Sequence, residues 1–328
     1  NLYNFLKNAD TSENSQTFIT THSPTLTSKI PLENLILLKD NTAYHVGKCF
    51  ENRHSEYIVR DKANNRLLNN NEVKNYRNMI ARYFDVTRSQ LLFSNGCLFI
   101  EGISECQLVE TFSKLIGKSL IDHQIEIVDT DGTAFYQFLM LFNSSDDKKR
   151  LPIRAAFVTD EDQFTESKDK EFNLDALIAD NYTQLNTLRN GINNVHMNGR
   201  VNNMIAMANG QAGVKISSGK KTLEYQICKA NVTRNKDAIK GSWLYELIKR
   251  ENVDGIGKVE AYIDSIGERD LNDVEQQNVA LLMWKCIPGK AGFAQTLNSF
   301  LIDKIETGGD VKFTVPTYIQ EAISHLVL

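Results

Sequence analysis

Short apolar runs alternate with longer amphipathic stretches through the middle of the chain. The apolar runs at 98–100, 124–128 and 153–158 have the length of buried strands. Between them, apolar residues recur at helical spacing over 105–116 and 134–142. This alternation predicts an α/β fold, in which a parallel sheet is built through right-handed crossover helices.

Outside this central unit the pattern predicts a mixture of short strands and many helices. Pro24 suits the first position of a helix, and Lys39 to Asn41 reads as a turn between two strands. The expected elements are the end of a helix within 1–16, strands at 16–20, 35–38 and 43–46, helices from Pro24 and over 71–83, a mostly helical region at 165–275, and closing helices at 274–284, 293–305 and 316–326.

Composition narrows the class of protein. The chain has 328 residues, of which 41% are hydrophobic and 24% are charged. This composition is typical of globular domains with hydrophobic cores. The net charge of −4 means that any nucleic-acid contact must come from local basic patches. Five cysteines without a CxxC motif, no signal peptide and no apolar run of membrane-spanning length predict a cytoplasmic protein with reduced thiols. Because Asn1 falls inside an apparent helix, we expect a part of a longer protein.

Acidic residues come at or just after the ends of two of the predicted strands. Glu101 comes after the run 98–100, and Asp160 and Asp162 follow the third strand. The carboxyl ends of parallel strands meet at one edge of a sheet, where α/β folds bind ligands. Strand alternation would place Asp160 and Asp162 on the same side. Carboxylates are the ligands that Mg²⁺ prefers, so the sequence predicts a shared metal site.

Four further acids admit two interpretations each. Glu105 lies one helical turn after Glu101, and it is either a ligand or a favourable acid in the first turn of a helix. Asp129 and Asp131 follow the middle strand and are second-choice ligands, because turn formation alone explains Asp131 well. Glu224 is either a late metal ligand or a surface acid.

Basic residues at three places are also candidates. Lys290 stands at a helix start, where the dipole disfavours it, so it either stabilises charge on a phosphate or is a solvated lysine. His22 either contacts the γ-phosphate of a nucleotide or is structural. The stretch 215–240 carries seven Lys and Arg against Glu224 and Asp237, and it is either a DNA contact or a solvated face. The chain has no Walker A motif, so it should not bind ATP well alone.

Six segments carry a resemblance to a known family, the OLD (overcoming lysogenization defect) proteins, which are ABC-type ATPases fused to a Toprim nuclease domain. The segments are TFITTHSPTLTSKIPLENLILL, FDVTRSQLLFSNGCLFIEGISE, IVDTDGTAF, FVTDED, PGKAGFAQTL and FTVPTYIQEAI. The resemblance covers nearly the whole chain. It implies the C-terminal part of the ATPase domain at 1–50, a connecting segment at 51–94, and a Toprim domain at 95–328 with a helical insertion around 165–275 and C-terminal helices.

The resemblance also implies a role for each candidate residue. Glu101 and Glu105 match the first Toprim carboxylates, and Asp160 and Asp162 match the DxD pair. The implied ligands of two Mg²⁺ or Mn²⁺ ions are Glu101, Glu105, Asp160 and Asp162, with Glu224 as an accessory ligand. Lys290 matches the catalytic lysine, and His22 matches the switch histidine that senses ATP. Extra acids at Asp129 and Asp131 depart from the family pattern.

The implied function is a two-metal DNA endonuclease that is regulated by its ATPase domain and acts in anti-phage defence. The implied partners are DNA, a second copy of the chain in a homodimer or higher homo-oligomer, and a defence-system helicase or a retron reverse transcriptase with its RNA–DNA. A topoisomerase would need a tyrosine nucleophile in a separate domain, which nothing in the sequence suggests. A DNA-repair ATPase of the RecF or SMC kind, with structural acids, is the remaining alternative, and the EGISE and DED motifs argue against it.

Overall fold

The chain folds into two compact units. The computed structural model describes residues 17–53, 58–61, 64–84, 88–132, 134–162, 172–194 and 199–327. The first unit comprises Asn1–Phe99, Ile121–Phe157 and Asn202–Ile216, and the second comprises Ile100–Leu120, Val158–Val201 and Ser217–Leu328. The domain boundaries expected from the resemblance stay a prediction.

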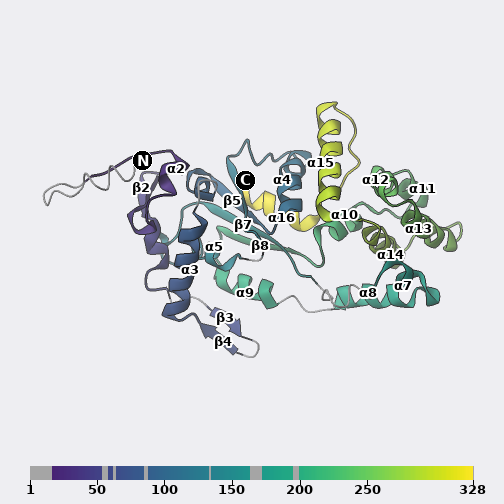
Figure 1. Ribbon diagram of the computed structural model, residues 1–328, viewed down its shortest axis with the longest axis horizontal. Coiled ribbons are helices and arrows are strands. Elements are labelled where there is room, and N and C mark those ends of the chain that lie inside the picture. The colour runs from purple at the N-terminus through teal and green to yellow at the C-terminus, as the bar shows by residue number, and fades with distance from the viewer. Residues whose placement is uncertain are drawn as a thin grey trace. The chain divides into compact units, whose positions relative to one another are not determined.

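A four-stranded sheet runs through the middle of the chain (Figure 1). Its strand order is β6–β5–β7–β8, where the strands are β5 Gly96–Ile100, β6 Ile125–Asp129, β7 Arg154–Asp160 and β8 Val214–Gly219. Strands β5 and β7 pair in parallel, with Phe99 opposite Phe157. The last residues of β5, β7 and β8 fall in the second unit, and the remainder of the sheet falls in the first.

The sheet confirms the predicted α/β class and its three predicted strands. The fourth strand, β8, lies in a region predicted to be helical, and there the prediction was wrong. Its segment VKISSG has only two large apolar residues, Val214 and Ile216, and ends in small polar residues. So short a run carries too little periodicity to be recognised as a strand before its neighbour β7 is known.

The core of the first unit is built on stacked aromatic rings. Phe99 on β5 and Phe157 on β7 stack with their centroids 4.5 Å apart and their planes within 7°. Phe138, on the short helix α5 (Tyr136–Leu139), packs 5.1 Å from Phe99. All three rings are fully buried. These contacts fix the two strands that lead to Glu101 and Asp160.

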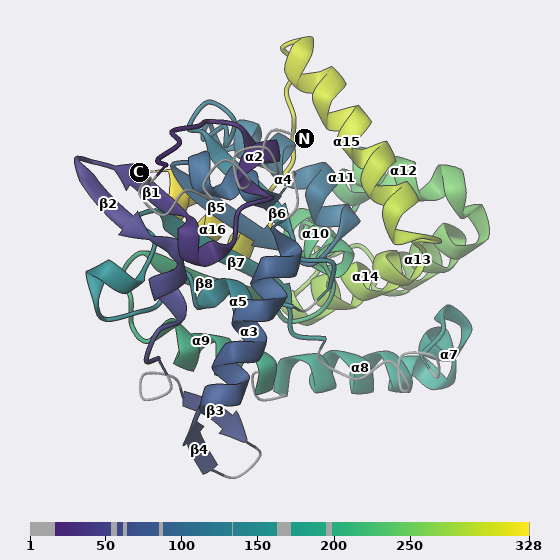
Figure 2. The same cartoon turned by 60° about the vertical axis from the view of Figure 1, so that its left-hand side comes forward.

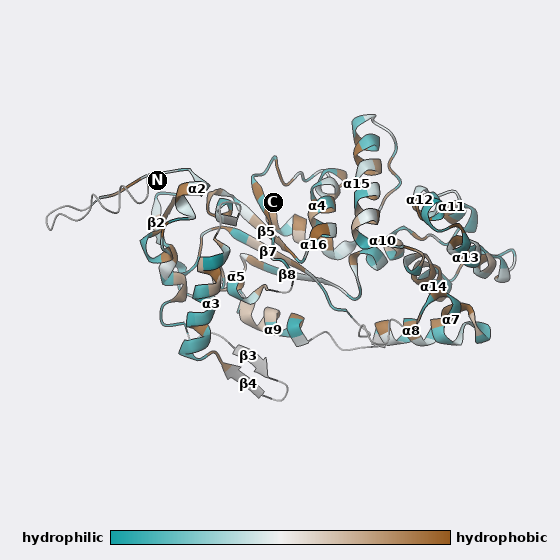
Figure 3. Cartoon of the chain, viewed as in Figure 1, coloured by the Kyte–Doolittle hydropathy of each residue, from teal (hydrophilic) through white to brown (hydrophobic). Residues whose placement is uncertain are grey.

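Helix α3 (Asn70–Tyr83) packs against α5 and has a hydrophilic outer surface (Figure 3). Its first turn is closed by a capping box, in which Asn69 and Glu72 each accept from the other's backbone N–H. Tyr83 at its other end contacts Phe138 with centroids 5.5 Å apart. The predicted helix at 71–83 is thereby confirmed, whereas α5 is shorter than the predicted 134–142.

The segments before α3 form small elements. Strands β1 (Ile36–Lys39) and β2 (Thr42–His45) pair antiparallel through a turn with positive φ at Asp40 and Asn41, as two-residue hairpins favour. Residues 17–20 have no regular structure, so the strand expected at 16–20 was wrong over its described part. The helix expected within 1–16 lies outside the described residues. The remaining small elements of this unit are α2 Pro24–Thr27, η1 Leu32–Asn34, η2 Val46–Phe50, β3 Ile58–Asp61, β4 Asn64–Leu67, η3 Arg88–Phe93 and η4 Asp147–Lys149.

The second unit is mainly helical. Helix α4 packs along α15 and also contacts α16, while α10 packs on α14 (Figures 1 and 2). The three predicted closing helices are confirmed as α14, α15 and α16. The helices are α4 Ile103–Leu115, α7 Leu174–Ile178, η5 Asp180–Tyr182, α8 Thr183–Asn194, α9 Gly199–Ala208 (shared with the first unit), α10 Leu223–Asn231, α11 Lys236–Lys240, α12 Trp243–Glu251, α13 Val253–Ser265, α14 Asp273–Lys285, α15 Lys290–Glu306 and α16 Thr317–Leu326.

None of the described helices is both long enough and apolar enough to cross a membrane. All five cysteines are free thiols.

Removing the Phe157 ring should destabilise the protein strongly, because it leaves a cavity against Phe99. We expect Phe157→Ala to lower the free energy of unfolding by about 3–5 kcal/mol, measured by urea denaturation. Phe18→Ala is the matched control. Because the Phe18 side chain is 77% exposed, its removal should hardly change the free energy of unfolding. Equal stability of the two variants would contradict a closed aromatic core between β5 and β7.

Candidate active site

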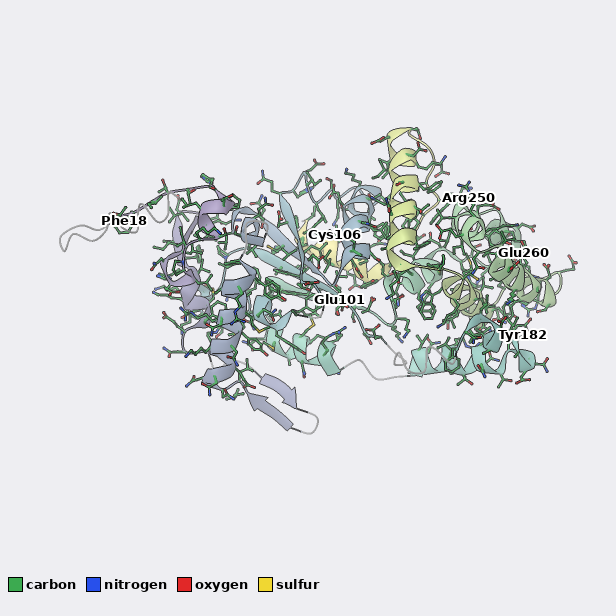
Figure 4. All side chains as sticks on the ribbon, in the orientation of Figure 1. Phe18, Glu101, Cys106, Tyr182, Arg250 and Glu260 are labelled. Atoms are coloured by element: carbon green, nitrogen blue, oxygen red, sulfur yellow. The ribbon has the colours of Figure 1, made fainter. Side chains whose placement is uncertain are left out.

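Glu101 leaves the end of β5 and is held by several donors (labelled in Figure 4). Its Oε1 accepts from the Thr159 hydroxyl, from the Asp160 backbone N–H at 3.1 Å and from Arg200 Nη2 at 3.0 Å. Arg200 Nη2 also donates to the Thr159 hydroxyl oxygen at 3.0 Å and to the Asp160 carbonyl. The Glu101 and Arg200 side chains are both about four-fifths buried, at 20% and 19% exposure. One carboxylate oxygen is thus fixed in place by three groups from β7 and α9.

Glu105 lies in the first turn of α4 and is buried, at 8% exposure. Gly102 occupies the N-cap position of this helix, so Ser104, a residue type that often caps helices, lies inside the first turn. Burial raises the pKa of Glu105 to about 7, against a smaller lowering by its backbone hydrogen bond. Glu224 and Glu101 raise this pKa further, and Lys290 lowers it. Glu224, Glu101 and Lys290 therefore lie within electrostatic reach of Glu105.

Asp160 is the last residue of β7 and is 9% exposed. Burial raises its pKa well above the usual value for an aspartate, and Glu105, Glu101, Asp162 and Glu224 each raise it further. All the acids implied as metal ligands therefore surround Asp160.

Asp162 lies two residues beyond the end of β7 and is exposed. Its φ of 47° is left-handed, so the strand alternation expected for Asp160 and Asp162 does not apply to it. Glu161 between them is turned to a different partner: its Oε1 accepts from the Ser218 hydroxyl at 2.7 Å, and its backbone N–H donates to the Gly219 carbonyl at 2.7 Å.

Glu224 lies in the first turn of α10 and is 3% exposed, so it is not a surface acid. Its Oε2 is shielded from solvent and has no hydrogen-bond partner among the described residues. A buried carboxylate oxygen without a donor is costly, and proteins keep such groups where a ligand satisfies them.

The donor chemistry of this cluster fits a divalent cation. Carboxylates gathered around the buried Asp160 and Glu105, with one oxygen of Glu224 unsatisfied, are the hard oxygen ligands that Mg²⁺ and Mn²⁺ favour. Across the described residues, no three His, Cys, Asp or Glu side chains already stand at ligating positions. Part of the reason is visible at Glu101, one oxygen of which is turned to Thr159 and Arg200.

Three other sequence candidates lie in the first unit. Asp129 ends β6 and its Oδ1 accepts from the Asp131 backbone N–H at 2.8 Å, while Asp131 has a φ of 55°. That geometry favours the turn-forming interpretation of both residues. His22 is exposed, in the loop before α2, where its ring lies 6.1 Å from that of Phe93.

Several cations of the basic stretch 215–240 are engaged within the protein. Arg234 pairs with Asp273 and Lys240 pairs with Asp264, each at 2.7 Å. Lys221 is 2% exposed, with its ammonium 5.8 Å from the Trp284 ring centroid. These three cations thus already have partners within the protein, and the choice between a DNA contact and a solvated face for the stretch 215–240 stays a prediction.

Sequence reasoning missed Thr159 and Arg200. Thr159 adjoins the DED motif, so its position was a usable signal. Arg200 lies 41 residues after Thr159, in the region predicted only to be mostly helical, and the fold alone brings it to Glu101.

The raised pKa of Glu105 predicts a pH-dependent penalty on stability. Below about pH 4.5 the Glu105 carboxyl is protonated in both the folded and the unfolded protein, so it has no effect on stability. Between about pH 4.5 and pH 7 the carboxyl ionises in the unfolded chain before it does so in the folded protein, so the destabilisation grows over this range. We expect Glu105→Gln, without divalent cations, to raise the free energy of unfolding by up to about 3 kcal/mol at pH 8 and to leave it unchanged at pH 4. Urea denaturation at both pH values measures this. An equal effect at both would contradict the burial of an ionised Glu105.

The comparisons with known proteins give one family-model match and several similar solved structures. Residues 92–162 match the family model "Overcoming lysogenization defect protein-like, TOPRIM domain". No curated protein matches the chain. Among solved structures, the C-terminal region of the Burkholderia pseudomallei OLD protein is similar, at 17% identity over 71% of this chain and 97% of that chain, with a TM-score of 0.38.

A second similar structure is the C-terminal region of the Xanthomonas campestris pv. campestris OLD protein, at 19% identity over 71% of this chain and 94% of that chain, with a TM-score of 0.38. The matched range 92–162 contains Glu101, Glu105, Asp160 and Asp162, together with three strands of the sheet. The chain therefore carries an OLD-like Toprim domain over residues 92–162, a domain of a nuclease-type family that generally binds divalent metal ions.

Proposed function

We propose that this chain is the nuclease part of a metal-dependent DNA endonuclease, which hydrolyses phosphodiester bonds. The observation that carries the proposal is the group of acids that raise the pKa of Asp160 from β5, α4 and α10 as well as from its own segment. So many carboxylates in one buried place are unfavourable unless a cation neutralises them. The Toprim match over 92–162 supports the same reading.

The residues that would hold Mg²⁺ or Mn²⁺ are Glu101, Glu105, Asp160, Asp162 and Glu224. A divalent cation bound there supplies Lewis acidity toward the phosphate and lowers the pKa of a water molecule.

Other groups of the chain would position these ligands and the substrate. Thr159 and Arg200 hold one oxygen of Glu101, which orients the carboxylate before a cation arrives. Lys290 is exposed at the first position of α15 and lies within electrostatic reach of Glu105. An ammonium group there, together with the N-terminus of the helix, favours the negative charge of a phosphodiester and of its transition state.

Regulation and partners extend this proposal on the strength of the resemblance. His22 would read the state of an ATP molecule held by an ATPase domain, and its exposed position leaves its ring accessible to such a ligand. ABC-type ATPases act in pairs, so the protein would work as a homodimer or higher homo-oligomer. Its task would be anti-phage defence, alone or with a helicase or retron partner.

Cleavage of supercoiled plasmid DNA tests the proposed nuclease. With Mn²⁺ we expect nicking or linearisation by the wild-type protein, and a loss of at least about 100-fold in rate for the double variant Asp160→Asn/Asp162→Asn, because both carboxylate ligands are neutralised. Parallel reactions with and without ATP measure its effect.

Glu161→Gln is the matched control for that experiment. It lies between the two aspartates but its side chain faces Ser218, so it should cleave at nearly the wild-type rate. Cleavage by the double variant at the wild-type rate would contradict the assignment of Asp160 and Asp162 to the active site. The absence of cleavage by the wild type under every condition would contradict the proposed nuclease activity.

A further inference from the structure

Tyr318 is not one of the candidate site residues, yet it is buried beside them. It is the second residue of α16, which begins directly after Pro316. Its side chain is 8% exposed, and Ile319 and Ile323 on the same helix are fully buried. The helix is therefore anchored by its apolar side chains, which hold the tyrosine in one place.

Contact with the end of β8 locates the phenol. Gly219 is the last residue of β8, and a Cβ added to it would lie 3.2 Å from Cζ of Tyr318, the ring carbon that bears the hydroxyl. The Gly219 carbonyl in turn accepts the backbone N–H of Glu161 at 2.7 Å. The hydroxyl end of Tyr318 thus lies at the ends of β7 and β8, next to the segment that carries Asp160.

The hydroxyl of Tyr318 is shielded from solvent and has no hydrogen-bond partner among the described residues. Burial raises the pKa of this phenol well above its usual value, and Asp160, Glu105, Glu224 and Glu101 raise it further. The phenol of Tyr318 is therefore a neutral donor at the ends of β7 and β8, within electrostatic reach of the carboxylate cluster. A buried hydroxyl with no acceptor is unfavourable, and phenylalanine would fill the same space without that cost.

We propose that Tyr318 is a substrate-contacting residue, whose hydroxyl donates a hydrogen bond to a non-bridging phosphate oxygen of DNA bound at the carboxylate cluster. This inference rests on the nuclease proposed above. A phosphodiester brings an anionic acceptor to a place where the protein offers an unused donor. A neutral phenol also adds no positive charge, so it does not oppose a divalent cation at the acids as another lysine would.

The variant Tyr318→Phe removes the hydroxyl and keeps the ring. DNA affinity is measured by fluorescence anisotropy with a labelled duplex in Ca²⁺, and kcat/KM is measured by cleavage in Mn²⁺. Because the lost hydrogen bond is to a charged acceptor, we expect both quantities to fall about 10- to 100-fold. The melting temperature without divalent cations should stay the same or rise, and Mn²⁺ affinity should change less than about threefold.

Tyr262→Phe is the matched control. The Tyr262 hydroxyl is also in a buried side chain, but it accepts from Asn278 Nδ2 at 2.7 Å on α14. This variant should show the opposite pattern, a lower melting temperature with unchanged DNA affinity.

Two results would overturn the role of Tyr318. Wild-type DNA affinity and cleavage in Tyr318→Phe would leave the tyrosine as a core residue only. A loss of Mn²⁺ affinity equal to the loss of activity would make it a partner of the carboxylates and not of the DNA. If the wild type binds DNA in Ca²⁺ and does not cleave it in Mn²⁺, the nuclease proposal fails, and the affinity difference still decides the contact made by Tyr318.

Discussion

Repulsion among buried carboxylates is the constraint around which this site is built. Asp160 and Glu224 are almost fully enclosed, and every acid near Asp160 makes its ionisation less favourable. The protein compensates only in part: Arg200 and Thr159 satisfy one oxygen of Glu101, while Oε2 of Glu224 has no donor in the part of the chain that the structure describes. A divalent cation would neutralise the remaining negative charge, and this connects the electrostatics of the site to its proposed chemistry.

The fold holds these repelling carboxylates in place by fixing the backbone position from which each side chain extends. Glu101 and Asp160 leave paired strands whose preceding residues, Phe99 and Phe157, stack in a closed core. Glu105 and Glu224 stand in the first turns of α4 and α10, where the helix dipole favours negative charge. The paired strands and the first turns of the two helices thus fix the backbone positions that bring these acids together.

Much of this arrangement could be read from the sequence, and the limits have physical causes. Glu101 was recognisable because an acid directly after a buried apolar run is costly unless it is paired or bound, and Asp160 because it follows a second apolar strand of the same predicted sheet. The strand β8 was missed since VKISSG is short and half polar, and the contact of Arg200 with Glu101 joins residues 99 positions apart. Sequence alone could not separate a buried Glu224 from a surface acid either, because both occur in the first turn of an amphipathic helix. Tyr318 carried no signal beyond its place in a family-like segment.

Stabilisation of the protein by a divalent cation is the most direct test of the carboxylate cluster as a cation site. The free energy of unfolding is measured at pH 7.5 with and without Mn²⁺, for the wild type and for Glu224→Gln, which keeps the side-chain volume and removes the charge. We expect Mn²⁺ at 100 times its dissociation constant to stabilise the wild type by about 2.7 kcal/mol, and to stabilise the variant much less at the same concentration. No stabilisation of the wild type, or equal stabilisation of both proteins, would contradict the claim that this carboxylate cluster, with Glu224 in it, is a cation site.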